Sequence, residues 1–339
     1  MVTLRDVAKH AGVSTAVVSA TISGGSGTIR MSDATRQRVL ASIEATGYTV
    51  NHAARSLRTA RTGVVSAVVP KIANPVFEHV VRGIQQEVAR NDGVLLLADS
   101  EWLTVGSHLL SRLAAGGMTD GFLVRRAQLG DDTIDELARL EVPCVVLASP
   151  DGVHPSIWVD DRAGVRRATR HLLGLGHRRV ALVGGLAHPD GFTDSRVIGF
   201  AEAFEQVEAA PSTDLYRPVG YDHGAAARAV SELLALEDRP TALVVDNVTS
   251  AAAVYGAIAR AGLRVPEDVS VVGYHDVAEA DVLWPALTTV RMPLHQVGVE
   301  AARMLHALVE REDVEARLLT GLAELVVRGS TAPPTGPRA

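Results

Sequence analysis

The chain has 339 residues, of which 47% are hydrophobic and 21% are charged. This composition is typical of a soluble α/β protein of about two domains, and it excludes a disordered chain. A single cysteine, Cys144, excludes an internal disulfide framework and a cysteine-based zinc site. No apolar run reaches membrane-spanning length and the amino terminus lacks a secretion signal, so we expect a cytoplasmic protein.

The charge of the chain is unevenly distributed. The formal net charge is -6, yet residues 1–62 carry eight basic and three acidic side chains, so the remainder carries -11. A basic segment on an acidic body is expected when only one part of a protein approaches phosphates. A solvated basic surface would have the same charge, so charge alone does not decide between the two interpretations.

Two short helices joined by a tight turn are predicted at the amino terminus. Thr3 and Asp6 have the spacing of a capping box, Gly12 suits a left-handed turn, and Ser14 can cap a second helix that ends at Ile22. This second helix begins with small residues that we expect to face outward, namely Thr15, Ala16 and Ser19. The arrangement predicts a helix-turn-helix, and a generic three-helix bundle is the alternative.

A third helix is predicted from Ser32 to Thr46, with Val39, Leu40 and Ile43 on its buried face. From Gly63 onward the pattern changes to short apolar runs separated by helical stretches. The predicted strands are 64–69, 94–97, 121–124, 144–147, 180–183, 242–245 and 269–272, with helices that include 76–89 and 132–140. Buried strands that alternate with helices predict parallel sheets, and two such series fit a two-lobed body with a cleft between the lobes.

A long signature in the first sixty residues resembles the headpiece of the lactose-repressor (LacI/GalR) family. The matching residues are Val2–Ala8, Ala11–Ser14, Val18–Ser19, Thr35–Val39, Gly47–Tyr48, Asn51 and Ala54–Arg58, and the similarity continues to about Arg328. The resemblance implies a homodimeric transcription regulator. We expect a repressor that a small sugar-like effector releases from a pseudo-palindromic operator, and corepression is the alternative. The spacing of histidines and cysteines predicts no metal site, and we expect no cofactor.

The resemblance also implies how DNA is bound. The helix that begins at Ser14 would lie in the major groove, and residues 51–62 would form a hinge helix and linker whose Leu57 wedges into the minor groove. The expected DNA-binding residues are Thr3, Ser14, Thr15, Ala16, Ser19, Arg30, Asn51, Ala54, Leu57 and Arg58. Ala20 stands where the family usually has an arginine, so few long hydrogen-bond donors remain to read bases, and the operator sequence is not predicted.

Polar residues that follow the predicted strands are candidates for effector contact, because ligands of open α/β sheets bind at the carboxyl ends of strands. The candidates are Asn74, Phe77, Arg196, Tyr221, Asp246 and His275, with Trp284 as a further aromatic that could stack on a sugar ring. Each has an alternative structural role, such as capping a helix. His275 stands where the family usually has an aspartate, so a nucleoside or a pathway intermediate remains open beside a sugar.

The body, residues 63–330, resembles a periplasmic binding protein. The resemblance implies an amino lobe of about 63–160 and 291–328 and a carboxyl lobe of about 161–289, with a tail at 331–339. The strand around 325–327 would complete the amino lobe. A sugar-binding transport protein would share this body but has no use for a basic headpiece, and an enzyme lacks support because no catalytic or metal-ligating constellation stands out.

Overall fold

The computed structural model describes residues 2–22, 31–48, 61–100, 109–125, 139, 141–147, 154–185, 195–220, 222–319, 321 and 323–335. The chain divides into two units, Met1–Thr62 and Gly63–Ala339. The predicted helix at 132–140 lies outside the described residues except for Arg139. No helix in the described part of the chain combines the length and the hydropathy needed to cross a membrane.

The described residues of the first unit form three helices, namely α1 (Leu4–Ala11), α2 (Thr15–Ile22) and α3 (Asp33–Thr46). Both halves of the predicted capping box form, because the Asp6 N–H donates to the Thr3 hydroxyl and the Thr3 N–H donates to the Asp6 carboxylate. Gly12 has the left-handed φ of 65° that the tight turn requires. The core contains Val7, Ala8, Ala11, Val18 and Val39.

The prediction that Leu40 faces this core is wrong. Leu40 is 44% exposed, and the buried face of α3 contains Val39 and Ser42 instead. Ser42 can be buried because its hydroxyl donates to the carbonyl oxygen of Arg38, 2.8 Å away. Because the Ser42 hydroxyl has a hydrogen-bond partner within its own helix, this polar residue can be buried in the core.

The first lobe contains a six-stranded sheet of order β11-β5-β4-β3-β1-β2. Its strands are β1 (Val64–Val69), β2 (Val94–Asp99), β3 (Gly121–Arg125), β4 (Cys144–Leu147), β5 (Ser156–Val159) and β11 (Arg317–Leu319), all paired in parallel. Within the described ranges its helices are α5 (Pro75–Arg90), α6 (Leu109–Ala115) and α13 (Leu294–Val309). Successive residues of one strand enter opposite cores, since Leu123 packs in one cluster and Val124 in the other. Burial on both faces explains why the central strands β1, β3 and β4 are largely apolar runs.

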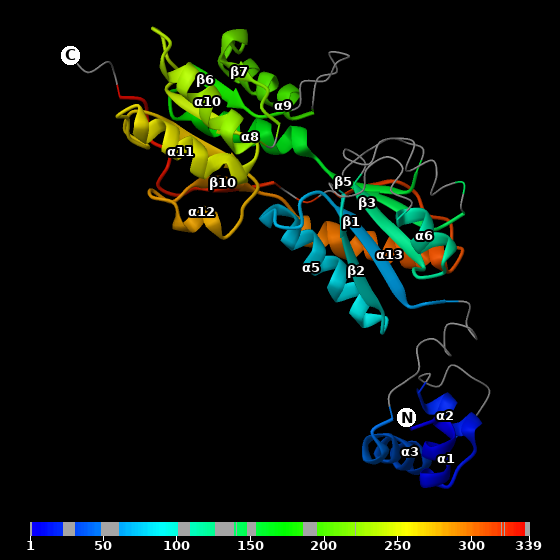
Figure 1. The fold of residues 1–339 in the computed structure, drawn as a ribbon. Coiled ribbons are helices and arrows are strands. Elements are labelled where there is room, and N and C mark those ends of the chain that lie inside the picture. Colours follow the sequence, from blue (N-terminus) through cyan, green and yellow to red (C-terminus); the bar gives the residue numbers. More distant parts are fainter. Residues whose placement is uncertain are drawn as a thin grey trace. The chain divides into compact units, whose positions relative to one another are not determined.

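The helices α5 and α13 lie side by side in the first lobe (Figure 1), and their backbones come into close contact at two glycines. A Cβ atom at Gly83 of α5 would overlap the carbonyl oxygen of His295, and a Cβ at Gly298 of α13 would overlap that of Val80. The two glycines therefore permit a contact that no larger residue could make without separating the helices.

The second lobe contains a six-stranded sheet of order β12-β10-β9-β8-β6-β7. Its strands are β6 (Val180–Val183), β7 (Tyr216–Arg217), β8 (Ala242–Val245), β9 (Ser270–Tyr274), β10 (Thr288–Arg291) and β12 (Glu324–Val326). Its helices are α8 (Asp161–Gly174), α9 (Ser195–Phe204), α10 (His223–Leu234), α11 (Ala251–Arg260) and α12 (Glu279–Val282), with short 3-10 turns at Glu205–Val207, Thr213–Leu215 and Val248–Ser250. The predicted class, a helical headpiece with a two-lobed core of two largely parallel sheets, is confirmed.

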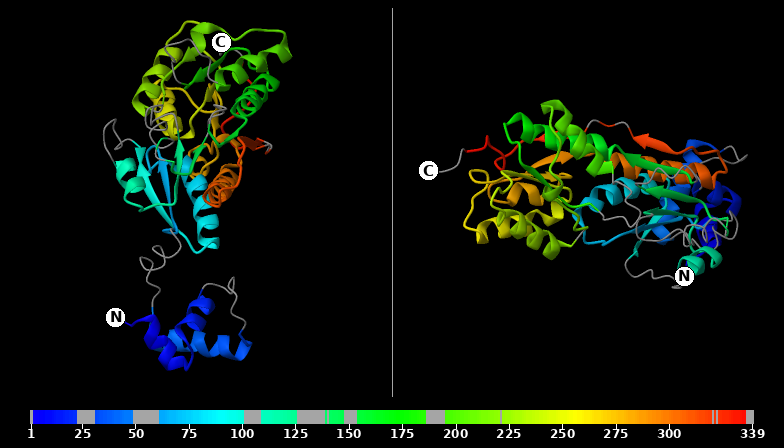
Figure 2. Two further views of the ribbon diagram at one scale, coloured as in Figure 1. Left: turned by 90° about the vertical axis from the view of Figure 1, so that its right-hand side faces the viewer. Right: turned by 90° about the horizontal axis from the view of Figure 1, so that it is seen from above.

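Three crossings connect the lobes. The chain leaves the first lobe at Asp160, returns between β10 and α13, and leaves again between β11 and β12. The colours in Figures 1 and 2 show this path. Green and yellow segments build the second lobe, and the orange helix α13 that follows them lies in the first. The prediction that the strand at 325–327 completes the first lobe is wrong. β12 pairs antiparallel with β10 in the second sheet, and β11 is the strand that joins the first.

Candidate effector site and DNA-binding surface

The start of α2 presents small side chains to solvent. Ser14, Thr15 and Ala16 are exposed, and Ser19 is partly exposed. Ser14 also caps the helix, because its hydroxyl accepts from the Val17 N–H at 3.4 Å. Thr3 is exposed at the start of α1. The other predicted DNA-binding residues lie outside the described residues, and they are Arg30, Asn51, Ala54, Leu57 and Arg58.

A buried arginine is the centre of a polar cluster in the second lobe. Arg196, the second residue of α9, is only 7% exposed. Its guanidinium donates to the carbonyl oxygen of Asp246 at 3.0 Å and lies 3.5 Å from the Asp161 carboxylate and 3.7 Å from the Asp246 carboxylate. It also stacks over the Tyr274 ring, 4.7 Å from the centroid. A planar guanidinium suits these several contacts in a way that lysine would not.

Asp161 and Tyr274 support this arginine. The Tyr274 hydroxyl donates to Asp161 at 2.6 Å. Burial by itself would raise the pKa of Asp161, but the charge of Arg196 and the Tyr274 hydrogen bond lower that pKa overall. Burial, reinforced by the nearby Asp161 charge, raises the pKa of Tyr274 well above its ordinary value, so the hydroxyl keeps the proton that it donates.

Asp246, at the end of β8, is 3% exposed and lies against a pair of glycines. Its carboxylate accepts from the Gly185 N–H. A Cβ atom at Gly184, where φ is 135°, would overlap that carboxylate. Gly184 and Gly185 after β6 therefore hold an acidic side chain in place. Two adjacent glycines are too short a motif to indicate dinucleotide binding, and their contact with Asp246 gives them a structural role.

His275 follows β9 with a φ of 70° and is 7% exposed. Its Nε2 lies 3.5 Å from the Arg196 guanidinium. Because a guanidinium only donates, Nε2 must accept, and the proton of the neutral ring is then on Nδ1. Among the described residues Nδ1 has no hydrogen-bond partner, nor has the buried Nδ2 of Asn247. Both atoms are donors that a ligand could satisfy.

Residues of the first lobe act on this cluster. Arg125, the last residue of β3, lies over the Phe77 ring at 5.4 Å, and its charge lowers the pKa of Asp161 and of His275. Phe77 itself is 8% exposed, so the Arg125 guanidinium covers the ring. The carboxyl ends of β3 and β9 thus bring charged groups from both lobes within electrostatic reach.

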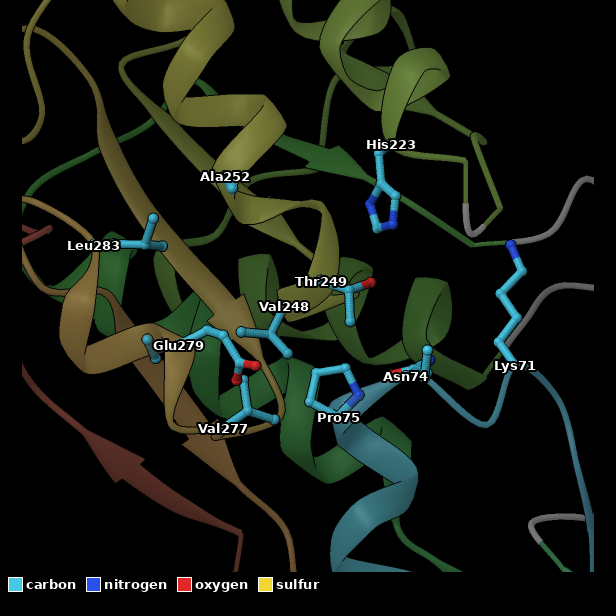
Figure 3. Close-up of a pocket in the computed structure, with 12 residues that line it drawn as sticks. Lys71, Asn74, Pro75, His223, Val248, Thr249, Ala252, Val277, Glu279 and Leu283 are labelled. Atoms are coloured by element: carbon cyan, nitrogen blue, oxygen red, sulfur yellow. The ribbon is translucent and has the colours of Figure 1, made fainter. Parts of the chain in front are cut away.

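A cavity of about 340 Å³ between the two lobes contains a further candidate. Figure 3 shows Lys71, Asn74 and Pro75 of the first lobe facing His223 and Thr249 of the second. Asn74 also caps α5, because its side-chain oxygen accepts from the Val76 N–H at 3.0 Å. The alternative role predicted for Asn74 is therefore present together with its place in the cavity wall.

The structure thus brings Arg196, Asp246 and His275 together, with Asn74 and Phe77 on the facing lobe. Tyr221 lies outside the described residues. Trp284 does not line the cavity and is 92% exposed, so it cannot stack on a ligand there. Sequence reasoning missed Arg125, Asp161 and Tyr274. Arg125 directly follows the apolar run Phe122–Val124, so the strand-end rule could have identified it.

Cys144 and the possible metal ligands are further candidates for catalysis or metal binding. Burial raises the pKa of Cys144 to about 12, as expected for a thiol in the core rather than a nucleophile. Within the described ranges, no group of three or more His, Cys, Asp or Glu side chains is arranged to hold a metal ion.

We expect His275 to make the stability of the fold pH-dependent. Burial and the charge of Arg196 lower its pKa from 6.5 to about 3. Between these values the unfolded chain binds a proton that the folded chain does not. The free energy of unfolding should therefore decrease as the pH is lowered through this range, by up to about 1.4 kcal/mol per pH unit. In His275→Asn, which tolerates a positive φ, this contribution should be absent.

Urea unfolding of both proteins between pH 6.5 and 4.5 measures the effect. His171 and His177 have lowered pKa values through burial but are present in both proteins, so the difference isolates His275. Equal pH slopes would show that His275 titrates in the folded protein as it does in the unfolded chain.

Comparison with known proteins agrees with this geometry. Residues 3–51 match the model of bacterial regulatory proteins of the lacI family, and residues 169–331 match a periplasmic binding protein-like domain. The HTH-type transcriptional repressor PurR of Aliivibrio fischeri (strain ATCC 700601 / ES114) is 32% identical over 339 residues, which cover 98% of this chain and 99% of that protein.

Two solved structures extend the comparison. The lac repressor dimer bound to operator and the anti-inducer ONPF is 25% identical, with a TM-score of 0.76 over 98% of this chain and 99% of that one. A LacI family transcriptional regulator from Enterococcus faecium with bound ribose is 27% identical, with a TM-score of 0.70 over 80% of this chain and 100% of that one. The chain therefore belongs to the LacI family of bacterial regulatory proteins.

Proposed function

We propose that a small polar effector, a sugar or a sugar derivative, binds in the cleft beside Arg196 and releases this repressor from operator DNA. As a member of its family the chain is a ligand-responsive, DNA-binding transcription repressor and not an enzyme. The observation that carries the effector site is the burial of Arg196 among carboxylates, next to donors on His275 and Asn247 that have no partner among the described residues. Action on chromosomal operators would place the protein in the cytoplasm.

The proposed class of effector follows from the donors and acceptors of this site. Arg196 and the two unpartnered nitrogens donate, whereas Asp246 and Asp161 accept, and a sugar hydroxyl can do both. The related regulator from Enterococcus faecium contains ribose, which supports a sugar in a body of this shape. The cavity of about 340 Å³ between the lobes is lined by Asn74 and His223 and not by Arg196, and its volume lies within the size range of small-molecule sites, roughly 300–1,000 Å³.

A thermal-shift screen of sugars and nucleosides on the whole protein tests this proposal. A ligand at a hundred times its dissociation constant stabilises the folded state by about 2.7 kcal/mol, which is a readily measured rise in melting temperature. A stabilising sugar should also release the protein from its operator in a gel-shift assay. Stabilisation by nucleosides alone would reject the sugar class.

We propose that operator recognition depends on a hinge wedge at Leu57, a residue outside the described ranges. In Leu57→Ala we expect operator affinity to fall about ten-fold or more while affinity for random DNA is unchanged, because the wedge acts only where the duplex is kinked. Arg58→Ala is the matched control, since loss of a phosphate contact weakens both kinds of DNA alike. Equal losses on both DNAs for Leu57→Ala would remove the wedge.

We further propose that the active form is a homodimer, whose twofold symmetry matches a pseudo-palindromic operator. The lac repressor is a dimer on its operator. Val282, the last residue of α12, is 80% exposed, and Trp284, two residues later, is 92% exposed. Exposed apolar side chains of this size mark an interface.

Trp284→Ser should weaken dimerisation by about 30-fold or more, the effect of removing a tryptophan at the centre of an interface. Analytical ultracentrifugation across protein concentrations measures the shift toward monomer. Met118→Ser, at an apolar residue of the first lobe that is 54% exposed, is the control and should remain dimeric. An unchanged dimer in Trp284→Ser would place the interface elsewhere.

A further inference from the structure

A second cavity, of about 470 Å³, lies where the chain crosses between the lobes. One wall comes from the first crossing, at Asp160 and the beginning of α8. The other comes from the third crossing, and it consists of Leu318, Leu319, Gly321 and Ala323. This cavity shares no lining residue with the cavity of about 340 Å³, and none of Arg196, Asp246 and His275 lines it.

The α8 wall is strongly basic. Ala163, Arg166, Arg167 and Arg170 line the cavity with the spacing i, i+3, i+4 and i+7, which places them on one face of the helix. Three guanidinium groups therefore border one cavity. Like charges so close repel one another unless counter-charges lie among them.

Nearby carboxylates pair with only some of the arginines on this face of α8. Glu202 of α9 binds Arg166 at 3.1 Å and also binds Arg162. The Asp160 carboxylate is used to cap α8, where it accepts from the Ala163 N–H at 2.8 Å. Arg167 and Arg170 are exposed and have no ion pair or side-chain hydrogen bond among the described residues. Asp160 keeps its negative charge at the edge of the cavity, so the three lining arginines and Asp160 leave the α8 wall with an excess of positive charge at Arg167 and Arg170.

The wall opposite the arginines is apolar. Leu318 is 39% exposed and Leu319 is 9% exposed, and both belong to β11, which pairs with β5. A site with cations on one side and leucines on the other suits a ligand with an anionic end and a carbon skeleton. Its volume lies within the range of small-molecule sites, roughly 300–1,000 Å³.

We infer that this cavity binds a small phosphorylated metabolite, with the phosphoryl group on Arg167 and Arg170. Guanidinium groups match phosphate oxygens in pairs, and charge-assisted hydrogen bonds of this kind are stronger than neutral ones. The proposed site lies at the segments that cross between the lobes, and not in the cleft that contains Arg196. A ligand there touches both the strand that leaves the first lobe and the helix that begins the second.

This position gives the ligand a regulatory effect, a consequence that rests on the proposed function. An occupant that fits one lobe orientation better than another shifts the population toward it, and the coupling to the effector is reciprocal. Binding of the phosphorylated ligand itself needs neither operator nor effector. Its test therefore succeeds or fails independently of the effector proposal.

Calorimetric titration of the full-length protein with ribose 5-phosphate, and with ribose as the uncharged partner, tests the inference. We expect ribose 5-phosphate to bind, and the double variant Arg167→Ala/Arg170→Ala to lose about ten-fold or more of this affinity. Arg112→Ala, at an exposed arginine of α6, is the matched control and should bind as the unaltered protein does. With inorganic pyrophosphate as a second probe, we likewise expect the double arginine variant to bind more weakly than the unaltered protein and Arg112→Ala.

A second pair of variants tests the site without touching an arginine. Leu318→Glu places a negative charge in the cavity and should abolish binding, whereas Leu318→Gln, of the same size but neutral, should retain most of it. Equal affinity in the double arginine variant and in Arg112→Ala would overturn the inference. So would equal losses in the two Leu318 variants, or binding of ribose with the same affinity and the same arginine dependence.

Discussion

Arg196→Ala is expected to abolish the response to effector and to lower the free energy of unfolding by about 3–5 kcal/mol. The loss is large because Arg196 is the partner of two carboxylates, Asp161 and Asp246, of which the second is almost fully buried. Without the guanidinium, a buried charge has no counter-charge, and removal of one partner costs more than the pair contributes. Chemical denaturation measures the stability, and operator release in the presence of effector measures the response.

Arg196→Lys separates the two effects. Lysine keeps the positive charge, so most of the stability should remain, but it cannot stack over Tyr274 and contact several oxygens at once. We expect this variant to fold, to bind operator and to respond weakly or not at all to effector. A full effector response in Arg196→Lys would mean that the guanidinium supports the fold and does not contact the ligand.

Gly298→Ala is expected to destabilise the first lobe by about 3 kcal/mol or more, the upper part of the range for overpacked cores. The added methyl group would meet the backbone of α5 at Val80 and Ile84, which cannot rotate away as a side chain can. The helices would have to separate along the core that contains Ile84 and Leu305. Thermal and urea unfolding measure the loss.

Gly174→Ala provides the control for the substitution itself. Gly174 is the last residue of α8, and nothing lies within 4 Å of the position that its Cβ would occupy. Alanine favours the helix by up to about 1 kcal/mol over glycine, so this variant should be as stable as the unaltered protein or slightly more so. If both glycine variants had the same small effect, α5 and α13 would have to be further apart than the structure has them.

Much of the fold was predictable because a strand that is buried on both faces of its sheet is a continuous apolar run, which can be seen in the local sequence. The runs Val64–Val69 and Val180–Val183 are strands within a residue of their predicted bounds. β12 was assigned to the wrong lobe because its three residues carry no information about their partner. Whether a short apolar segment pairs antiparallel with β10 or parallel with β5 depends on the path of the chain through the crossings.

The candidate site divides in the same way. Asp246 and His275 were identifiable because each directly follows a buried strand. Asp161 and Tyr274 were not, since their hydrogen bond joins residues 113 positions apart and exists only when α8 packs on β9. Leu40 illustrates the converse failure. The helical period allowed it inside, but the core closed over Ser42, whose hydroxyl bonds to its own helix.

The three crossings have a consequence for biosynthesis. The first lobe needs α13 and β11, and the second needs β12, which begins at residue 324 of 339. The first lobe lacks a strand until residue 319 has been translated, and the second lacks one until residue 326 has been translated. The first unit, by contrast, is a contiguous segment of 62 residues and has its own core. Domains fold as they emerge, so we expect the DNA-binding unit to be folded on the nascent chain before the body that regulates it exists.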